Sequence, residues 1–297
     1  MFEPTHRPRI FAMAPGVDFP ETLADGLIGR MAGRAPEDMA RVTIYLNTAT
    51  MREKLISAFL ARKAGFLPRL RLVTDIGKMP RPDLLPIARP LRQRLELSVL
   101  VARLIEVERG KAPGVDAYDL AVSLHDLMEE MQDLGIQPDA LQNPGLSEDQ
   151  AEHWQRSLRF LQVIQPFFAA EARPSAAARQ RLMIEHLVGQ WAAQPPSDPI
   201  ILAGSTGSRG STALLMEAVA RLPQGAVILP GFDWDMPEFG WNSLYSGPVP
   251  NEDHPQFRYA RLMKSLGLKS TDVGTWHGAS APDRARNRLI SLALRPA

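Results

Sequence analysis

The chain has 297 residues, of which 45% are hydrophobic and 23% charged, with a formal net charge of +1. This composition is that of an ordinary globular protein rather than a disordered or fibrous one. The absence of cysteine excludes disulfides, thiolate catalysis and cysteine-bound zinc or iron–sulfur centres. No uncharged apolar run reaches about 18 residues, and the first residues lack the layout of a signal peptide. We therefore expect a cytoplasmic protein without a membrane segment.

Five short apolar runs, bounded by turn-forming residues, predict buried strands. They are Ile10–Met13, Val42–Leu46, Leu70–Thr74, Ile200–Ala203 and Ala226–Leu229. Three of them precede helical patterns, at Glu21–Arg34, Met51–Ala64 and Ser211–Leu222. Strands that alternate with helices pair in parallel through right-handed crossovers. The sequence therefore predicts an α/β fold with a parallel sheet covered on both faces.

The stretch between the third and fourth strands shows only helical periodicity. Its four predicted helices are Leu84–Gly110, Val115–Leu134, Ser147–Ala172 and Ser175–Ala193. We therefore expect an α/β core made of residues 1–84 and 196–297, with an all-helical subdomain inserted at 85–195. A Pro- and aromatic-rich loop, Pro230–Pro255, follows the fifth strand and precedes helices at Gln256–Leu266 and Asp283–Leu294. Because the sequence stops directly after a helix, we expect it to be the N-terminal part of a longer protein.

The opening strand, turn and helix have the layout of a phosphate-binding loop but lack its chemistry. Such a loop needs the pattern G-x-x-x-x-G-K-[ST], whose lysine and backbone N–H groups hold the phosphates. Only Gly16 is present, and no Lys-Ser or Lys-Thr pair follows it. The strand Ile200–Ala203 also lacks the terminal aspartate that holds magnesium in nucleotide hydrolases. We therefore predict a degenerate P-loop NTPase-like fold that lacks the Walker motifs, hydrolyses no ATP and binds no cofactor. The alternative is a divergent nucleotide-binding site at Gly16.

Small polar side chains follow three of the predicted strands. Ligands of α/β sheets bind at the carboxyl ends of the strands, where hydroxyls, amides and helix N-termini can position phosphates of nucleic acid. The candidate nucleic-acid-binding residues are Asn47, Thr48, Thr50, Arg52, Arg71, Thr74, Ser205, Thr206, Ser208 and Arg209. Thr50 and Ser211 have a second interpretation as N-caps of the helices that they begin.

Charge is segregated along the chain. Residues 1–112 carry 19 Lys and Arg against 12 Asp and Glu, whereas residues 113–173 carry 3 against 11. A basic surface can face a polyanion while an acidic one is turned away or meets a basic partner. The acidic segment is equally consistent with a solvated helix.

A hydrolase is the enzymatic alternative. Ala203-Gly-Ser-Thr-Gly207 is similar to a nucleophile elbow, in which Ser205 would be the nucleophile. His254 or His277 could then activate it, oriented by Asp233 or Asp235.

Several longer segments resemble one family. They are Met13-Ala-Pro-Gly-Val-Asp-Phe19, Glu152-His-Trp-Gln-Arg-Ser-Leu-Arg-Phe-Leu161, Leu202-Ala-Gly-Ser-Thr-Gly-Ser208, Ala220-Arg-Leu-Pro-Gln-Gly-Ala-Val-Ile-Leu-Pro-Gly-Phe-Asp233 and His254-Pro-Gln-Phe257. In these the chain is similar to the N-terminal part of the AddB family, which forms one half of the bacterial AddAB helicase–nuclease, in its alphaproteobacterial form. The resemblance runs over nearly all of the chain and is specific as a whole rather than at any one motif.

The resemblance implies a superfamily-1 helicase-like domain whose helical stretch is the inserted subdomain. It implies a non-catalytic module that grips DNA and binds the AddA protein, which supplies ATP-driven translocation. The complex resects double-strand breaks for homologous recombination, and its nuclease and cysteine-bound iron–sulfur cluster lie downstream of this segment. We therefore expect DNA and AddA as partners and no enzyme activity in this segment alone.

Overall fold

The structure is a computed structural model, and it describes residues 1–3, 5, 7–62, 65–81, 83–107, 116–141, 162–168, 173–246, 250–278 and 281–296. The chain forms two compact units. Unit 1 comprises Met1–Asp75 and His186–Ala297, and unit 2 comprises Ile76–Glu185. Helix α6 (Ala176–Ala193) runs through the second boundary, so no loop marks it.

Unit 1 contains a six-stranded sheet in which every pair of neighbouring strands is parallel. The strand order is β3-β2-β4-β5-β1-β6. The strands are β1 (Ile10–Ala12), β2 (Thr43–Leu46), β3 (Arg69–Leu72), β4 (Ile200–Ala203), β5 (Gly225–Leu229) and β6 (Gly274–Thr275). The predicted α/β class, the parallel pairing and the first five strands are confirmed. The sixth strand was not predicted, because two residues carry no periodicity.

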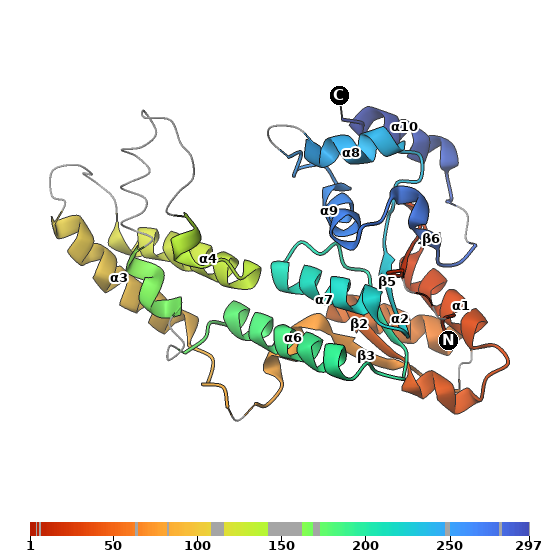
Figure 1. Cartoon of the computed structure of the whole chain (residues 1–297), viewed down its shortest axis with the longest axis horizontal. Helices are drawn as coiled ribbons and strands as arrows, with labels where there is room; N and C mark the ends of the chain where they lie inside the picture. The colour runs from red at the N-terminus through yellow and green to blue at the C-terminus, as the bar shows by residue number, and fades with distance from the viewer. Residues whose placement is uncertain are drawn as a thin grey trace. The chain divides into compact units, whose positions relative to one another are not determined.

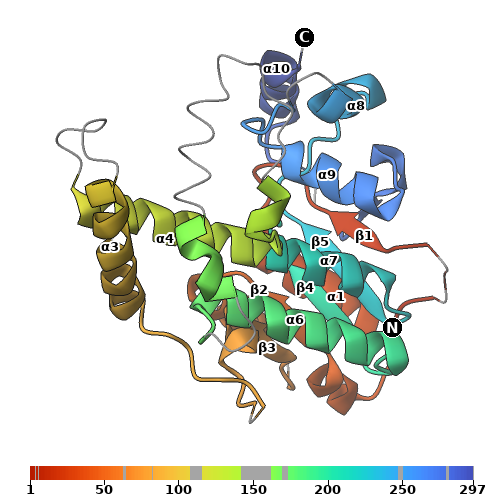
Figure 2. The same ribbon diagram turned by 60° about the vertical axis from the view of Figure 1, so that its left-hand side comes forward.

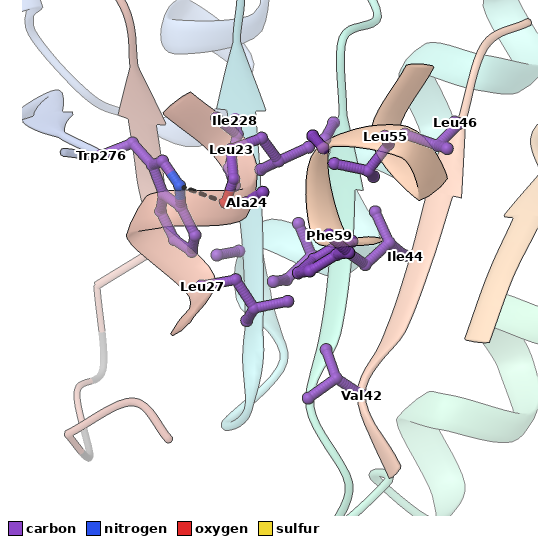
Figure 3. Packing of buried hydrophobic residues seen from close by; sticks show 14 of the residues in the cluster. Leu23, Ala24, Leu27, Val42, Ile44, Leu46, Leu55, Phe59, Ile228 and Trp276 are labelled. Atoms are coloured by element: carbon purple, nitrogen blue, oxygen red, sulfur yellow. Dashed lines mark hydrogen bonds between the residues drawn. The ribbon is translucent and has the colours of Figure 1, made fainter. Parts of the chain in front are cut away.

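Helices cover both faces of this sheet. On one face, α1 (Phe19–Met31) and α2 (Ala49–Ala61) bury Leu23, Leu27 and Phe59 against Ile44 and Ile228. Figure 3 shows these side chains between the two helices and the strands. On the other face, α7 (Gly210–Arg221) contacts β4 and β5, and α9 (Phe257–Leu266) contacts α7. In Figures 1 and 2, α7 lies on the opposite side of the strands from α1.

The core strands are apolar throughout because both faces are covered. All four residues of β4 and all five of β5 are buried. The edge strand β3 differs, since Arg69 and Arg71 are exposed and alternate with half-buried Leu70 and Leu72. This alternation is that of a strand with one covered face.

The described part of unit 2 is helical. Helices α3 (Pro90–Val107) and α4 (Ala117–Leu134) pack through an apolar core of their own, which includes Leu97, Val101 and Met128. Asp116 caps α4 by accepting a hydrogen bond from the Tyr118 N–H at 2.7 Å, and Gly135 ends it in the left-handed conformation. Most of the predicted helix Ser147–Ala172 lies outside the described residues.

The loop predicted at Pro230–Pro255 contains a helix, α8 (Glu238–Ser246), and this prediction was wrong. Pro237 stands just before the first helical residue, where proline's fixed φ favours a helix rather than breaking one. The last helix, α10 (Arg284–Leu294), begins one residue after its predicted start. The described residues also contain short 3₁₀ helices: Pro36–Arg41, Val73–Lys78, Pro138–Leu141, Gln165–Phe168 and Ser270–Asp272.

Candidate nucleic-acid interface

The sheet topology of unit 1 has two switch points at the carboxyl ends of the strands, where neighbouring connections diverge, and they are called crevices below. Adjacent β2 and β4 lead into helices on opposite faces, α2 and α7. Adjacent β1 and β5 also lead to opposite faces. Strand β1 leads into α1 on one face, whereas β5 leads through α8 into α9, which contacts α7 on the other face. Ligands of open α/β sheets bind where neighbouring connections diverge in this way. Unit 1 therefore offers two places for a ligand.

The predicted nucleic-acid-binding residues other than Arg71 gather at the first of these, the β2/β4 crevice. The loops after β3, β2 and β4 lie side by side because these strands are neighbours in the sheet. Arg52 is half-buried, Ser205 is buried, and the remaining candidates are exposed or half-buried: Asn47, Thr48, Thr50, Arg71, Thr74, Thr206, Ser208 and Arg209. The structure thus brings together three loops that are up to about 160 positions apart in the sequence.

Two of these residues have clear local roles. Thr48 is the N-cap of α2, and its hydroxyl accepts a hydrogen bond from the Met51 N–H at 3.1 Å. The interpretation of Thr50 as the cap was therefore wrong by two residues. Ser205 is 7% exposed, and its hydroxyl accepts from the Gly207 N–H at 3.2 Å. Ser205 holds the turn after β4 in place rather than presenting its side chain to solvent.

Ser211 is not a cap either. The N-cap of α7 is Arg209, which makes no side-chain capping hydrogen bond, and Ser211 is buried within the helix at 1% exposure. Because arginine cannot accept a hydrogen bond, its side chain cannot neutralise the positive end of the helix dipole. The Arg209 side chain therefore adds no negative charge at the start of α7.

Arg71 lies apart from the loops. It sits within β3 opposite Tyr45 of β2, and burial raises the pKa of the Tyr45 hydroxyl while the hydrogen bond and charge of Arg71 act against that shift. The guanidinium of Arg71 is therefore engaged with Tyr45.

Arg52 and Arg209 make no side-chain hydrogen bond or ion pair within the described ranges, so they are the cations that this crevice can offer to a ligand.

Electrostatics separate the two crevices. Neither α2 nor α7 has an acidic residue in its first turn. At the β1/β5 crevice, by contrast, the Asp18 carboxylate caps α1 by accepting from the Glu21 N–H at 3.1 Å, and Asp283 caps α10. Since a helix N-terminus attracts anions only where its charge is not already met by a carboxylate, phosphate is favoured at β2/β4 and opposed at β1/β5.

The opening loop at the β1/β5 crevice is also engaged by the last helix and the residues before it. Gly16 has φ of +83°, so a side chain there would be strained. The Asn287 side chain donates to the Pro15 carbonyl at 2.9 Å, and Pro282 lies 3.5 Å from where a Cβ of Gly16 would stand. These contacts occupy the surface of the opening loop that a nucleotide phosphate would need. They join the opening loop to the start of the last helix, and these segments are too far apart in the sequence for any local pattern to predict their contact.

Among the residues that the structure describes, Ser205 makes no hydrogen bond with a histidine. His254 accepts from the Gln256 N–H through Nδ1 at 3.1 Å and has the Leu294 carbonyl 3.0 Å from Nε2, and burial lowers its pKa. His277 follows β6, three strand positions from β4, which is about 14 Å at the usual strand spacing. Helix α7 begins five residues after Ser205, whereas a nucleophile elbow leads directly into its helix.

Within the described residues, no three His, Asp or Glu side chains gather closely enough to hold a metal ion. The helices described there are all too short or too polar to cross a lipid bilayer. Comparison of the chain with protein-family models and with curated proteins gives no match.

Proposed function

We propose that this chain is a non-catalytic, helicase-like DNA-binding module whose β2/β4 crevice holds the phosphate backbone of a single strand. Two observations on this crevice carry the proposal. The two helices that begin there, α2 and α7, have no acidic residue in their first turns. Arg52 and Arg209 also lie there, and neither has a side-chain partner in the part of the chain that the structure describes. Exposed hydroxyls and amides surround them, which are the groups that contact phosphates in nucleic-acid complexes.

The resemblance to the AddB family extends this proposal. It makes the chain a segment of a cytoplasmic ATP-dependent helicase–nuclease that processes double-strand breaks for homologous recombination, with AddA as the catalytic partner. In that setting unit 2 is the inserted helical subdomain. Its helix α4 carries exposed Asp119 and Glu130 and no Lys or Arg, which suits a basic protein partner rather than DNA, whereas Asp126 is paired with Arg94.

The test is fluorescence anisotropy with a labelled single-stranded oligonucleotide at two salt concentrations. Phosphate contacts release counterions, so the affinity should fall steeply as salt rises. Replacing both cations, in R52Q/R209Q, should weaken binding by about tenfold or more at low salt. It should also reduce the slope of log K against log salt by about 0.7 for each lost contact.

Arg69 provides a matched control. It is exposed, it belongs to the same sheet, and it begins β3 at the opposite end of the strand from the crevice. R69Q should bind like the unchanged protein. Weakening by R69Q as large as that by R52Q or R209Q alone would show that net charge rather than the crevice attracts DNA, and no binding at low salt would overturn the proposal.

A further inference from the structure

The second crevice of unit 1 contains a cavity of about 420 Å³, a size found in small-ligand sites. Its lining comes from the loops after β1, β5 and β6 and from the start of α10, including Met13, Trp234, Asp235, Thr275 and Arg284. The proposed phosphate site leaves this cavity without a role.

An aromatic side chain forms one part of the cavity lining. Trp234 is 41% exposed and packs on Phe232 with ring centroids 4.7 Å apart. Phe232 is fully buried and stacks in turn on Trp241, also at 4.7 Å. Trp234 is therefore held by buried rings behind it while part of its own surface stays available for stacking.

The charges in the cavity decide which part of a nucleotide could enter. The Asp233 carboxylate accepts hydrogen bonds from the backbone N–H groups of Asp235 (2.9 Å) and Met236 (3.1 Å). The Asp235 carboxylate is exposed and has no hydrogen-bond partner among the residues that the structure describes. Asp233 and Asp235 outnumber Arg284 in the cavity lining and so disfavour a phosphate, whereas the free Asp235 carboxylate can accept a hydrogen bond from the amino group of a base.

We propose that this cavity binds an unstacked nucleobase of the same single strand whose backbone lies at the β2/β4 crevice. The proposal rests on the proposed function. Trp234 stacks on the base, Asp235 accepts from its exocyclic amino group, and Arg284, unpartnered within the described ranges, faces the strand from the rim. The two crevices are two strand spacings apart, about 10 Å, a distance that a few nucleotides of one strand can span.

The experiment compares three oligonucleotides of equal length: oligo-dC, oligo-dT and an abasic strand with the same backbone. The full 297-residue chain should bind oligo-dC about 5- to 150-fold more tightly than the abasic strand, since stacking on one aromatic side chain has that effect. W234A should bind oligo-dC and the abasic strand equally, and W234F should restore part of the difference. D235N should remove the preference for dC, which has an amino group, over dT, which does not.

The control variant is F239A. Phe239 is 64% exposed and lies on α8, outside the cavity lining, so its loss should leave all three affinities unchanged. Equal binding of the three strands by the unchanged protein would overturn the base pocket and leave the phosphate site intact. No binding of any strand would overturn both proposals. If free cytidine saturated the cavity while the abasic strand bound as tightly as oligo-dC, the cavity would be a nucleoside site, and the tethered-base proposal would be wrong.

Discussion

Gly26 shows how one residue of α1 fixes the position of a buried tryptophan. A Cβ at Gly26 would lie 2.6 Å from Cδ1 of Trp276, closer than real side-chain contacts allow. The Trp276 indole N–H donates to the Leu23 carbonyl at 3.2 Å, and the Arg30 guanidinium lies 3.8 Å from the ring centroid. Figure 3 shows the indole lying against α1. The absence of a side chain at Gly26 is what lets the ring approach the helix so closely.

Gly26→Ala should therefore destabilise unit 1 even though alanine is the better helix former by about 1 kcal/mol. The buried ring must move, which costs about 1 to 3 kcal/mol in a packed core. Urea denaturation followed by circular dichroism measures this change in the free energy of unfolding.

Gly29→Ala is the control on the same helix, because nothing lies within 4 Å of a Cβ there. It should stabilise the protein by about 0.5 to 1 kcal/mol. The two substitutions are chemically identical, so their opposite signs report the tryptophan contact alone. A stabilising Gly26→Ala would show that the ring is not held as described.

At the scale of elements, an ion-pair cluster joins α1 to the end of α2. Arg62 donates hydrogen bonds to Asp25 and to Glu21, one of them from Nη2 to Asp25 Oδ2 at 2.7 Å. The hydrogen bond from Arg62 lowers the pKa of the Asp25 carboxyl. A carboxyl with a lowered folded-state pKa stabilises the fold above its unfolded pKa, near 3.9, and this contribution is lost as the pH falls through the folded-state value.

Asp25→Asn should make the free energy of unfolding less dependent on pH below about pH 4 and should reduce it slightly at neutral pH. The effect at neutral pH should stay below about 1 kcal/mol, because the Asp25 side chain is 42% exposed. Urea denaturation at several pH values gives both quantities. R62Q should reduce the pH dependence of the free energy of unfolding over the same range, and D25N/R62Q should reduce it no further. If the effects of the two single substitutions added up in the double variant, the two residues would act independently.

The secondary structure could be predicted where burial imposes a pattern. Runs of Val, Ile and Leu marked β2, β4 and β5 because both faces of these strands are covered. In unit 1 the starts of the predicted helices were found within two residues, but the cap of α2 was assigned to Thr50 instead of Thr48, because two nearby threonines offer the same hydroxyl. Helix α8 was missed among prolines and glycines that usually mark loops.

The candidate site could be predicted only in part. The sequence pattern alone shows that polar residues follow three of the strands. That these residues meet at one crevice depends on β3, β2 and β4 being neighbours in the sheet, which the pattern does not show. The buried position of Ser205 and the engagement of Arg71 with Tyr45 depend on packing that no local pattern encodes. The cavity lined by Trp234 and Arg284 joins distant segments, so no run of neighbouring residues could have signalled it.

At the scale of the whole molecule, each unit contains an apolar cluster of its own. In unit 1 one such cluster lies between the sheet and α1 and α2, and in unit 2 one lies between α3 and α4. Chains with more than one core need not unfold in one step, so a single melting temperature is not a sufficient measure of their stability. Hydrogen exchange, which reports the opening of each segment, distinguishes the two units.

Within unit 2, Arg179 connects the segment before α3 to α6. The residue is 8% exposed, and its guanidinium donates to the backbone carbonyls of Gly77 (3.0 Å), Met79 (3.1 Å) and Leu85 (3.2 Å). R179M keeps much of the side-chain volume but leaves three carbonyls without this donor, at a cost of about 2 to 4 kcal/mol. Amide exchange should therefore speed up in α3 and α4 while β4 and β5 stay protected.

R92Q is the control, since it removes only an exposed pair with Glu96 on α3 and should change exchange little. Equal acceleration in β4 and β5 on R179M substitution would show that the units open together, because the loss of a connection confined to unit 2 cannot by itself loosen the sheet of unit 1.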